Sequence, residues 1–258
     1  MSSILPNFKN FIVIVGWDKF ADLVTEQLAN TQRQAIALVD DQKIADRVNS
    51  TYDNQKVVAI KMDYFNIEKL KKLPLDRAFG IYVNLATDRD RLMYVFQLRK
   101  HFPELAIITP VVNQKLKESF AVIPNIFPLS RDAISAKIFA SHLFKQDVAT
   151  YLNELLSPAT CDKDHKLRQY KILADNPLCN EMYGDAFIKV KQDYNAVLVG
   201  ISKRTAEGKY ELRKNPTDET LVQKNDYLII LVNEKSAQAL EQAFGIVTET
   251  PNDDSAPL

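Results

Sequence analysis

The chain has 258 residues, of which 46% are hydrophobic, enough for one large domain or two smaller ones with their own cores. Lysine plus arginine and aspartate plus glutamate each number 33, so no net charge draws the protein to nucleic acid or to an anionic membrane. Apolar runs are far shorter than the roughly 20 residues of a membrane-spanning helix, and the first residues lack a secretion-signal pattern. We therefore expect a cytoplasmic protein. Cys161 and Cys179 fit no zinc or disulfide pattern and are expected to be free thiols.

Short apolar segments alternate with amphipathic helical patterns from residue 11 to residue 129, which predicts a Rossmann-like α/β domain with a doubly wound parallel sheet. Strands are expected at 11–16, 34–40, 56–61, 79–84, 106–111 and near Ile126. Helices are expected to begin near Asp18, Asp41, Asn66, Asp88 and Asn113. In the first helix Phe20, Leu23, Val24 and Leu28 recur at helical spacing, so this face is expected to lie on the sheet.

Two further helices, 130–144 and 146–156, are expected after the last strand, with Ser130 as the N-cap of the first. Helices in this position often form an arm that packs on a partner subunit, but their periodicity fits a cap within the chain equally well. The polar stretch after them carries Pro158 and predicts a linker. The expected divisions are a first domain at 1–129, the arm at 130–157, a linker at 158–169, a second domain at 170–246 and a disordered tail at 247–258.

The second domain is predicted to be a smaller α+β fold, because its apolar segments are short and rich in strand formers. Strands are expected at 170–174, 186–190, 196–203, 209–213 and 227–232, with helices at 178–183 and 234–244. The segment "TAEGKY", with Gly208 at its tip, predicts a hairpin turn.

The first strand ends at a glycine turn that is typical of nucleotide-binding folds but incomplete. A dinucleotide fingerprint has Gly-x-Gly-x-x-Gly, and the corresponding residues are Gly16, Asp18 and Ala21. Gly16 permits the tight turn, and the following helix directs backbone N–H groups into the crevice. The Asp18 carboxylate stands where a pyrophosphate needs bare backbone, so we favour Asp18 as the N-cap of the helix over Asp18 as a ligand contact.

Other polar residues follow the expected strands at the edge where open α/β sheets bind their ligands. Asp40 ends the second strand, where an acidic residue contacts the ribose hydroxyls of an adenosine group, while Asp41 is expected to cap the next helix. Asn84, Thr87 and Asp88 follow the fourth strand and are candidate ligand contacts, although Thr87 and Asp88 equally suit helix capping.

The sequence identifies no set of metal ligands, so whether the chain binds a metal stays open. Cys161, Asp162, Asp164 and His165 crowd together and could be drawn as a ligand set. Because linkers attract polar residues in general, we favour an ordinary polar linker at these positions.

By order and motif the chain resembles the RCK family, the regulators of potassium conductance, and the related TrkA-type transport subunits. The residues that carry the likeness are "VIVGW", "ALVDD", "IKMD", "YVNLATDRDRLM" and "FPLSRDAISAKIFASHLF", then "YGDAFIKVKQDYNAVLVGISKR" and "LVQKNDYLIILV". The likeness runs from about Phe11 to Gly245. It implies a nucleotide-binding-like TrkA-N domain, a helical dimerisation arm and a TrkA-C-like ligand-binding domain. In this family, homodimers assemble into a ring, usually an octamer of domains, beneath a potassium channel or transporter.

The resemblance also implies site residues. The pair Gly16 and Trp17 is similar to the version in channel gating rings, whereas transporter subunits tend to keep all three glycines. Asp63 matches an aspartate that the family uses near adenine or a divalent cation, and it suits capping of the following helix equally well. Calcium-gated members carry paired glutamates after the fifth strand, but Pro110 and Val112 stand at those positions here, so that calcium site is expected to be missing.

In the second domain the resemblance to the family's ligand-binding surface rests on a few polar positions and one turn. They are Asn176, Tyr183, Gly184, Asp185 and residues 213–218, "RKNPTD". Arg213 and Lys214 could hold a phosphate, but two cations in a turn are more often solvated.

We therefore predict a non-enzymatic, ligand-sensing gating-ring domain of a potassium channel or transporter, on the inner face of the membrane. Its ligand is expected to be an adenine nucleotide (AMP, ADP, ATP or NAD) or a divalent cation. An NAD-dependent oxidoreductase, a TrkA-type NAD-binding transport subunit and a scaffold with a dead pocket are the alternatives. The three histidines, at a helix end, in the arm and in the linker, form no catalytic set. A detached ring, a separate subunit and a channel fragment all remain open.

Overall fold

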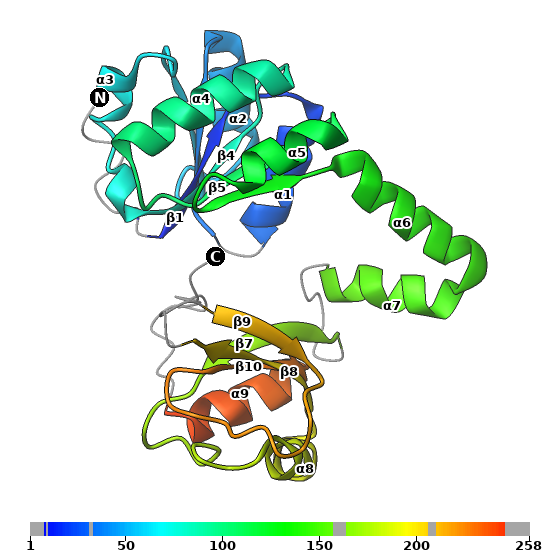
Figure 1. Cartoon of the computed structure of the whole chain (residues 1–258). Helices are drawn as coiled ribbons and strands as arrows, with labels where there is room; N and C mark the ends of the chain where they lie inside the picture. Colours follow the sequence, from blue (N-terminus) through cyan, green and yellow to red (C-terminus); the bar gives the residue numbers. More distant parts are fainter. Residues whose placement is uncertain (1–7, 9, 31–32, 157–163, 206–209, 246–258) are drawn as a thin grey trace. The chain divides into compact units, whose positions relative to one another are not determined.

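The computed structural model describes residues 8, 10–30, 33–156, 164–205 and 210–245. The chain divides into two compact units, Met1–Lys145 and Gln146–Pro257. Figure 1 shows that the first unit is built on a parallel sheet and the second on a smaller antiparallel sheet. Among the described residues, no helix is both long and apolar enough to cross a membrane.

Six parallel strands form the sheet of the first unit, in the order β3-β2-β1-β4-β5-β6. The strands are β1 (Phe11–Val15), β2 (Ala35–Val39), β3 (Val57–Lys61), β4 (Ala78–Val83), β5 (Ile107–Pro110) and β6 (Ile126–Leu129). The chain reverses its winding direction between β1 and β4, and ligands of such sheets bind in the crevice beyond the carboxyl ends of these two strands. The predicted Rossmann-like fold class is confirmed, and this crevice is the place to look for a site.

Helices cover both faces of the sheet. Neighbouring strand residues point to opposite faces, and since both sets are apolar, each face needs a cover. Val13 and Val15 of β1 pack in one apolar cluster, and Ile14 packs in the other. The helices of the first cluster are α3 (Ile67–Leu70), α4 (Asp88–His101) and α5 (Gln114–Ala121), and a 3-10 turn lies at Leu75–Arg77. The helices of the second cluster are α1 (Lys19–Asn30) and α2 (Gln42–Thr51).

Helix α1 presents a different face to the sheet from the one that its large apolar residues predict. Phe20 and Leu23 are 37% and 49% exposed, and the buried residues are Ala21 and Thr25. Small side chains at this spacing let the helix approach β1 closely, and the Thr25 hydroxyl donates to the Ala21 carbonyl instead of remaining unpaired. The prediction that this set covers the sheet is therefore wrong for Phe20 and Leu23, whereas Leu28 packs against the second cluster as expected. The guanidinium of Arg131 stacks 4.6 Å from the Phe20 ring instead.

Short polar side chains fix the helix starts of the first unit; Asp41 and Ser130 were predicted as caps, whereas α3 is capped by Asn66 and not by Asp63. Asp41, Asn66 and Asn113 accept a backbone N–H as N-caps of α2, α3 and α5. Ser130 does the same for α6 (Arg131–Phe144). Each cap satisfies a backbone donor that the helix itself leaves without a partner.

No residue of α6 is buried, and Figure 1 shows this helix extending away from the sheet of its own unit. Its exposed apolar residues include Ile134, Phe139 and Leu143, of which the last two are 72% and 78% exposed. A helix that capped the first unit would bury apolar side chains against it, so α6 is not an intrachain cap of the unit to which it belongs.

The second unit has an antiparallel sheet in the order β7-β10-β8-β9. Its strands are β7 (Lys166–Lys171), β8 (Val197–Arg204), β9 (Tyr210–Lys214) and β10 (Tyr227–Val232), and its helices are α7 (Gln146–Leu156), α8 (Tyr183–Tyr194) and α9 (Glu234–Ala243). Strand β10 is central and mostly buried, and its inward side chains pack with those of α8 and α9 in one core. This matches the predicted α+β character of the domain.

Two expectations for the second unit are wrong. Residues 186–190 lie in α8 rather than in a strand, because Tyr183, Ala186 and Val190 form a buried face at helical spacing. The predicted helix at 178–183 is a series of turns before α8. Apolar residues in "AFIKVK" imitate the alternation of a strand over a few positions. The helix is 12 residues long, and the short apolar pattern did not indicate that length.

Strand β7 begins four residues earlier than predicted, at Lys166 in the stretch expected to be a linker. It is an edge strand with two exposed residues. Its sequence, "KLRQYK", is therefore too polar to be recognised as a buried strand. The tip of the predicted β8–β9 hairpin and the predicted tail lie outside the described residues.

Candidate functional site

Gly16 shapes the crevice between β1 and β4. It has a φ of +80°, and a Cβ at this position would stand 2.5 Å from the carbonyl oxygen of Asn84, the residue after β4. Glycine is therefore required both by the backbone conformation and by the close approach of the two strand ends. The tight turn expected of Gly16 is present.

Asp18 is held by the protein on both carboxylate oxygens. Its Oδ1 accepts the Ala21 N–H and an Asn84 side-chain N–H, each at 2.8 Å, and its Oδ2 lies 3.8 Å from an Arg131 nitrogen. The first of these bonds is the expected helix-capping bond. The Ala21 N–H, a donor that a phosphate could use at this helix N-terminus, is thus already bonded to Asp18, and the negative charge of Asp18 disfavours a diphosphate there.

The Asn84 side chain is buried, with 6% of the residue exposed, and it bridges β4 to α1. Its Oδ1 accepts the Tyr82 hydroxyl at 3.2 Å. Burial raises the pKa of Tyr82 to about 12, so this phenol stays protonated and acts as a donor at neutral pH. Trp17 packs on the second apolar cluster, and its buried Nε1–H has no acceptor among the residues that the structure describes.

Thr87 and Asp88 begin α4, and both have structural partners. Thr87 is the N-cap: its hydroxyl accepts the Asp90 N–H and donates to the Asp90 carboxylate. The Asp88 carboxylate lies 2.6 Å from an Arg91 guanidinium nitrogen and accepts the backbone N–H groups of Val112 and Asn113. It therefore ties α4 to the loop between β5 and α5.

These bonds determine how Asp88 ionises. Burial opposes its negative charge, but hydrogen bonds from the Asn113 and Val112 N–H groups and from Arg91 outweigh burial, and the pKa lies below the ordinary value of 3.8. The Arg91 side chain is only 3% exposed, so the two charges compensate each other in a poorly solvated place.

Asp40, Asp41 and Asp63 lie beyond β2 and β3 and are solvent-exposed. Asp41 caps α2 through the Lys43 N–H, as expected. Asp63 lies 3.9 Å from the Lys69 ammonium, and its backbone carbonyl, not its side chain, accepts the Asn66 N–H. The Asp40 side chain makes no hydrogen bond or ion pair within the described part of the chain, so it stands free at the end of β2.

The positions at which calcium-gated relatives were expected to carry glutamates contain no carboxylate. Pro110 ends β5, and Val112 is 67% exposed and donates its backbone N–H to Asp88. Across the described residues, no group of three or more histidine, cysteine, aspartate or glutamate side chains could hold a metal ion. Cys161 and Asp162 of the drawn ligand set lie outside the described residues, and His165 donates its backbone N–H to Glu154. Cys179 is a free thiol.

In the second unit, the family-like residues serve mainly to fix the backbone. The Asn176 Oδ1 accepts the Leu178 N–H, and Gly184 packs so closely on Asp218 that a Cβ would stand 2.9 Å from the Asp218 Cβ. The Arg213 guanidinium bonds the Glu211 carboxylate on the same strand. The suggestion that Arg213 holds a phosphate is therefore not supported by its contacts.

Two arginines at the crevice were missed by the sequence analysis. Arg91 neutralises Asp88 and Arg131 approaches Asp18. The spacing of Asp88 and Arg91, three residues apart in a helix, is a signal for the first pair. No local signal identifies the second pair, because Arg131 follows Asp18 by the length of a whole domain.

Known proteins share both the sequence pattern and the fold of this chain. Residues 12–123 match the TrkA-N domain family. The probable potassium channel protein 2 of Methanocaldococcus jannaschii is 21% identical over 243 residues, which cover 93% of this chain and 68% of that protein. The human SLO3 gating ring superposes with a TM-score of 0.66 and 13% identity over 91% of this chain, so the two share a fold.

The present chain spans 46% of the SLO3 gating-ring chain. A structure titled "GsuK channel bound to NAD" covers 95% of this chain and 41% of its own at 15% identity, but its TM-score of 0.45 is too low to support an argument. The strand order, the Gly16 turn and the family match all concern the same segment. Residues 12–123 of this chain match the TrkA-N family, in agreement with the predicted resemblance to the RCK and TrkA-type proteins.

Proposed function

We propose that this chain is a ligand-sensing regulatory module of a potassium channel or potassium transporter, acting on the cytoplasmic side of the membrane. The TrkA-N match, the named potassium channel relative and the fold shared with a gating ring support the proposal. In such a module a ligand works by binding one conformation better than another, and no chemical step is required. We accordingly propose a sensor rather than an enzyme.

One observation carries the choice of ligand. At the switch point of the sheet the Gly16 turn is intact, and the Asp40 carboxylate stands free at the end of β2, in the position that binds ribose hydroxyls in Rossmann-like domains. Asp18, by contrast, caps α1 and accepts a bond from Asn84 at the place where a diphosphate would bind. We propose an adenine nucleotide held through its ribose by Asp40, with a nucleoside monophosphate fitting better than a dinucleotide.

Ligand binding is tested by thermal unfolding with AMP, ADP, ATP, NAD, Mg²⁺ or Ca²⁺ at constant ionic strength. A ligand at about 100 times its dissociation constant stabilises the folded state by about 2.7 kcal/mol. We expect AMP to raise the melting temperature of the wild-type chain and Asp40→Asn to abolish most of that rise. The matched control is Asp41→Asn, which removes a neighbouring charge but keeps an N-cap residue, and its response to AMP is expected to equal that of wild type.

A response to Mg²⁺ or Ca²⁺ alone would instead favour the divalent cation as the ligand. If no nucleotide and no cation shifts the melting temperature, the sensor proposal fails and a structural ring without a ligand is the better account. Turnover of NAD with hydride delivered to a second substrate would replace the proposal by the oxidoreductase.

For the assembly, we propose that α6 is the dimerisation arm, with the dimers forming a ring. The support is the exposure of Ile134, Phe139 and Leu143 on this one helix, because large apolar side chains gathered on a surface are typical of an interface. Light scattering after gel filtration is expected to give at least a dimer for the wild-type chain and a monomer for Phe139→Glu. Lys137→Glu, an exposed change of charge on the same helix, is the control and is expected to remain associated. A monomeric wild-type chain would rule out the arm.

A further inference from the structure

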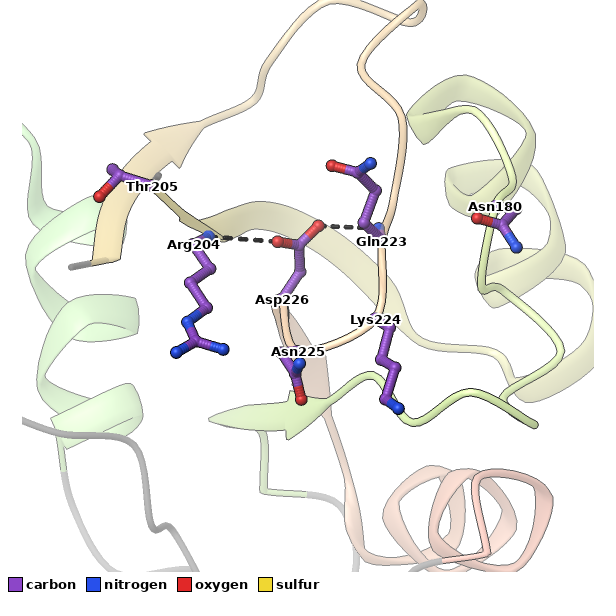
Figure 2. A pocket seen from close by; sticks show the side chains of 7 residues that line it. All are labelled: Asn180, Arg204, Thr205, Gln223, Lys224, Asn225 and Asp226. Carbon is purple, nitrogen blue, oxygen red and sulfur yellow. Dashed lines mark hydrogen bonds between the residues drawn. The ribbon is translucent and has the colours of Figure 1, made fainter. Parts of the chain in front are cut away.

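A polar pocket of about 500 Å³ lies at one end of the sheet of the second unit, where β8 ends and β10 begins. It is far along the chain from the TrkA-N crevice, and it does not use the residues that resemble the family's ligand surface. Figure 2 shows its lining: Asn180, Arg204, Thr205, Gln223, Lys224, Asn225 and Asp226.

The one acidic residue of this lining, Asp226, is fully engaged by the protein. It is 2% exposed, its Oδ1 accepts the Arg204 backbone N–H at 3.2 Å, and its Oδ2 accepts the Gln223 N–H at 2.8 Å. The same Oδ2 lies 2.6 Å from the Lys203 ammonium. The negative charge of Asp226 is thus cancelled by Lys203, which is not part of the lining.

The two cations of the lining have no such partner. The Arg204 guanidinium and the Lys224 ammonium make no hydrogen bond or ion pair within the described residues, and both side chains are exposed. In Figure 2 they extend to the same side of the pocket, with the Asn225 amide between them. Asn225 has a φ of +70°, and its backbone N–H is bonded to the Ile172 carbonyl, so the turn that carries Lys224 and Asn225 is fixed.

After these pairings the pocket has a net charge of about two positive units, in a chain whose total charge is zero. An arginine guanidinium binds phosphate oxygens through two parallel hydrogen bonds, and a lysine adds a mobile point charge. The volume is in the usual range for small-molecule sites, so a phosphate group with a small organic substituent is accommodated.

We propose that this pocket is a second binding site of the chain, for a small phosphate monoester, with Arg204 and Lys224 holding the phosphate and the Asn225 amide bonding one of its oxygens. The ligand is a small molecule rather than a nucleic acid, since the chain as a whole carries no net positive charge. The proposal is independent of the nucleotide proposed for the TrkA-N crevice, because the two sites share no residue.

The test uses the full-length chain, with inorganic phosphate and glycerol 3-phosphate as probes. Titration calorimetry is carried out in chloride buffer at constant ionic strength, because exposed charges are screened by salt. We expect Arg204→Gln and Lys224→Gln each to weaken binding of glycerol 3-phosphate several-fold, and the double variant to weaken it at least tenfold. Lys235→Gln removes an exposed charge from α9, in the same unit, and is expected to bind like wild type.

Both pocket residues are exposed, so the variants are expected to keep the wild-type melting temperature, and a loss of binding is then not a loss of folding. Asp40→Asn is expected to retain phosphate binding, which separates this site from the TrkA-N crevice. The proposal is overturned if the wild-type chain binds neither probe, or if the double variant binds glycerol 3-phosphate as tightly as wild type. A loss of equal size in Lys235→Gln also overturns it, because it would show non-specific attraction.

Discussion

The crevice of the first unit and the pocket of the second differ in whether their charged side chains are paired within the protein. At the crevice, Asp18 and Asp88 look like ligand contacts in the sequence, yet each is bonded to several groups of the protein. In the pocket, the acid Asp226 is cancelled by Lys203, and two cations are left without partners among the described residues. The comparison teaches that the charge that remains after internal pairing, rather than the residue types at a site, indicates which ligand the site can bind.

The largest effect is expected from a side chain added at Gly16. Gly16→Ala brings a Cβ to 2.5 Å from the Asn84 carbonyl oxygen at a positive φ, so we expect the free energy of unfolding to fall by about 3–4 kcal/mol. Trp17 is the single tryptophan of the chain, and its fluorescence during urea unfolding reports on the first unit.

The control for this change is Gly245→Ala. Gly245 also has a positive φ, +66°, but nothing lies within 4 Å of the place that an alanine Cβ would take. We expect Gly245→Ala to lower the free energy of unfolding by about 1 kcal/mol, because only the positive φ and no steric contact opposes the alanine. Unfolding of the second unit is followed by circular dichroism. Equal losses in the two variants would show that the contact with Asn84 does not matter.

The second prediction concerns Asp88, and it tests whether this carboxylate is structural. Asp88→Asn leaves the Arg91 charge buried without its counter-ion, and we expect a loss of about 3 kcal/mol by Trp17 fluorescence. The exposed Glu118→Gln on α5 is the control and is expected to change stability by less than about 0.5 kcal/mol. A loss of stability no larger than that of Glu118→Gln would contradict the structural role of Asp88 and would favour a role in ligand binding.

The same pair has a defined pH dependence. Because the folded-state pKa of Asp88 lies below 3.8, its contribution is complete above about pH 5 and is lost as the pH falls through the folded pKa. The difference in stability between wild type and Asp88→Asn is therefore expected to shrink between about pH 5 and pH 2. A difference that stays constant over this range would show that the carboxylate is not the group responsible.

These bonds also show which contacts could be predicted from the sequence and which could not. The N-caps at Asp41, Asn66 and Asn113 are local, because each involves residues two or three positions apart; Asp41 was predicted as a cap, and helix starts were predicted near Asn66 and Asn113. The doubly wound parallel sheet was predicted from the alternation of strands and helices, and its strand order is shown by the structure. The contact of Asp88 with the Val112 and Asn113 N–H groups spans a strand and a helix, so the sequence showed a candidate ligand where the fold has a structural tie.

The pocket of the second unit was missed for a related reason. Arg204 and Lys224 lie on different segments, and they become neighbours because β8 and β10 pair antiparallel. The misassigned strand at 186–190 and the polar edge strand β7 further obscured the fold around it. Pairing between distant segments, which sets both the fold and the charge balance of a site, has no local signature.

The third prediction tests the charge balance of the pocket. Asp226→Asn removes the partner of Lys203, but Lys203 keeps the Leu221 carbonyl and the Gln223 side chain as acceptors. We therefore expect a smaller loss than at Asp88, about 2 kcal/mol, seen by circular dichroism without a change in Trp17 fluorescence. The exposed Asp175→Asn is the control and should leave the unfolding midpoint unchanged. If Asp226→Asn is as stable as wild type, Asp226 does not neutralise Lys203 and the charge count of the pocket is wrong.

The smallest expected effect sharpens the comparison at Asp18, and it depends on the nucleotide proposed for the crevice. Asp18→Asn keeps an N-cap oxygen for the Ala21 N–H but removes the negative charge from the helix N-terminus, where Arg131 then lacks an ionic partner. Stability is expected to change by less than about 0.5 kcal/mol.

Affinity for a diphosphate, in contrast, is expected to rise. Removing a carboxylate close to a phosphate relieves about 1 kcal/mol of repulsion, so ADP should bind about fivefold more tightly to Asp18→Asn than to wild type, with a smaller gain for AMP. Glu26→Gln, the same change of charge on the exposed side of α1, is the control and should leave both affinities unchanged. Equal gains for ADP and AMP would mean that Asp18 repels any nucleotide through its charge alone. The preference for a monophosphate would then have to come from the shape of the Gly16 turn.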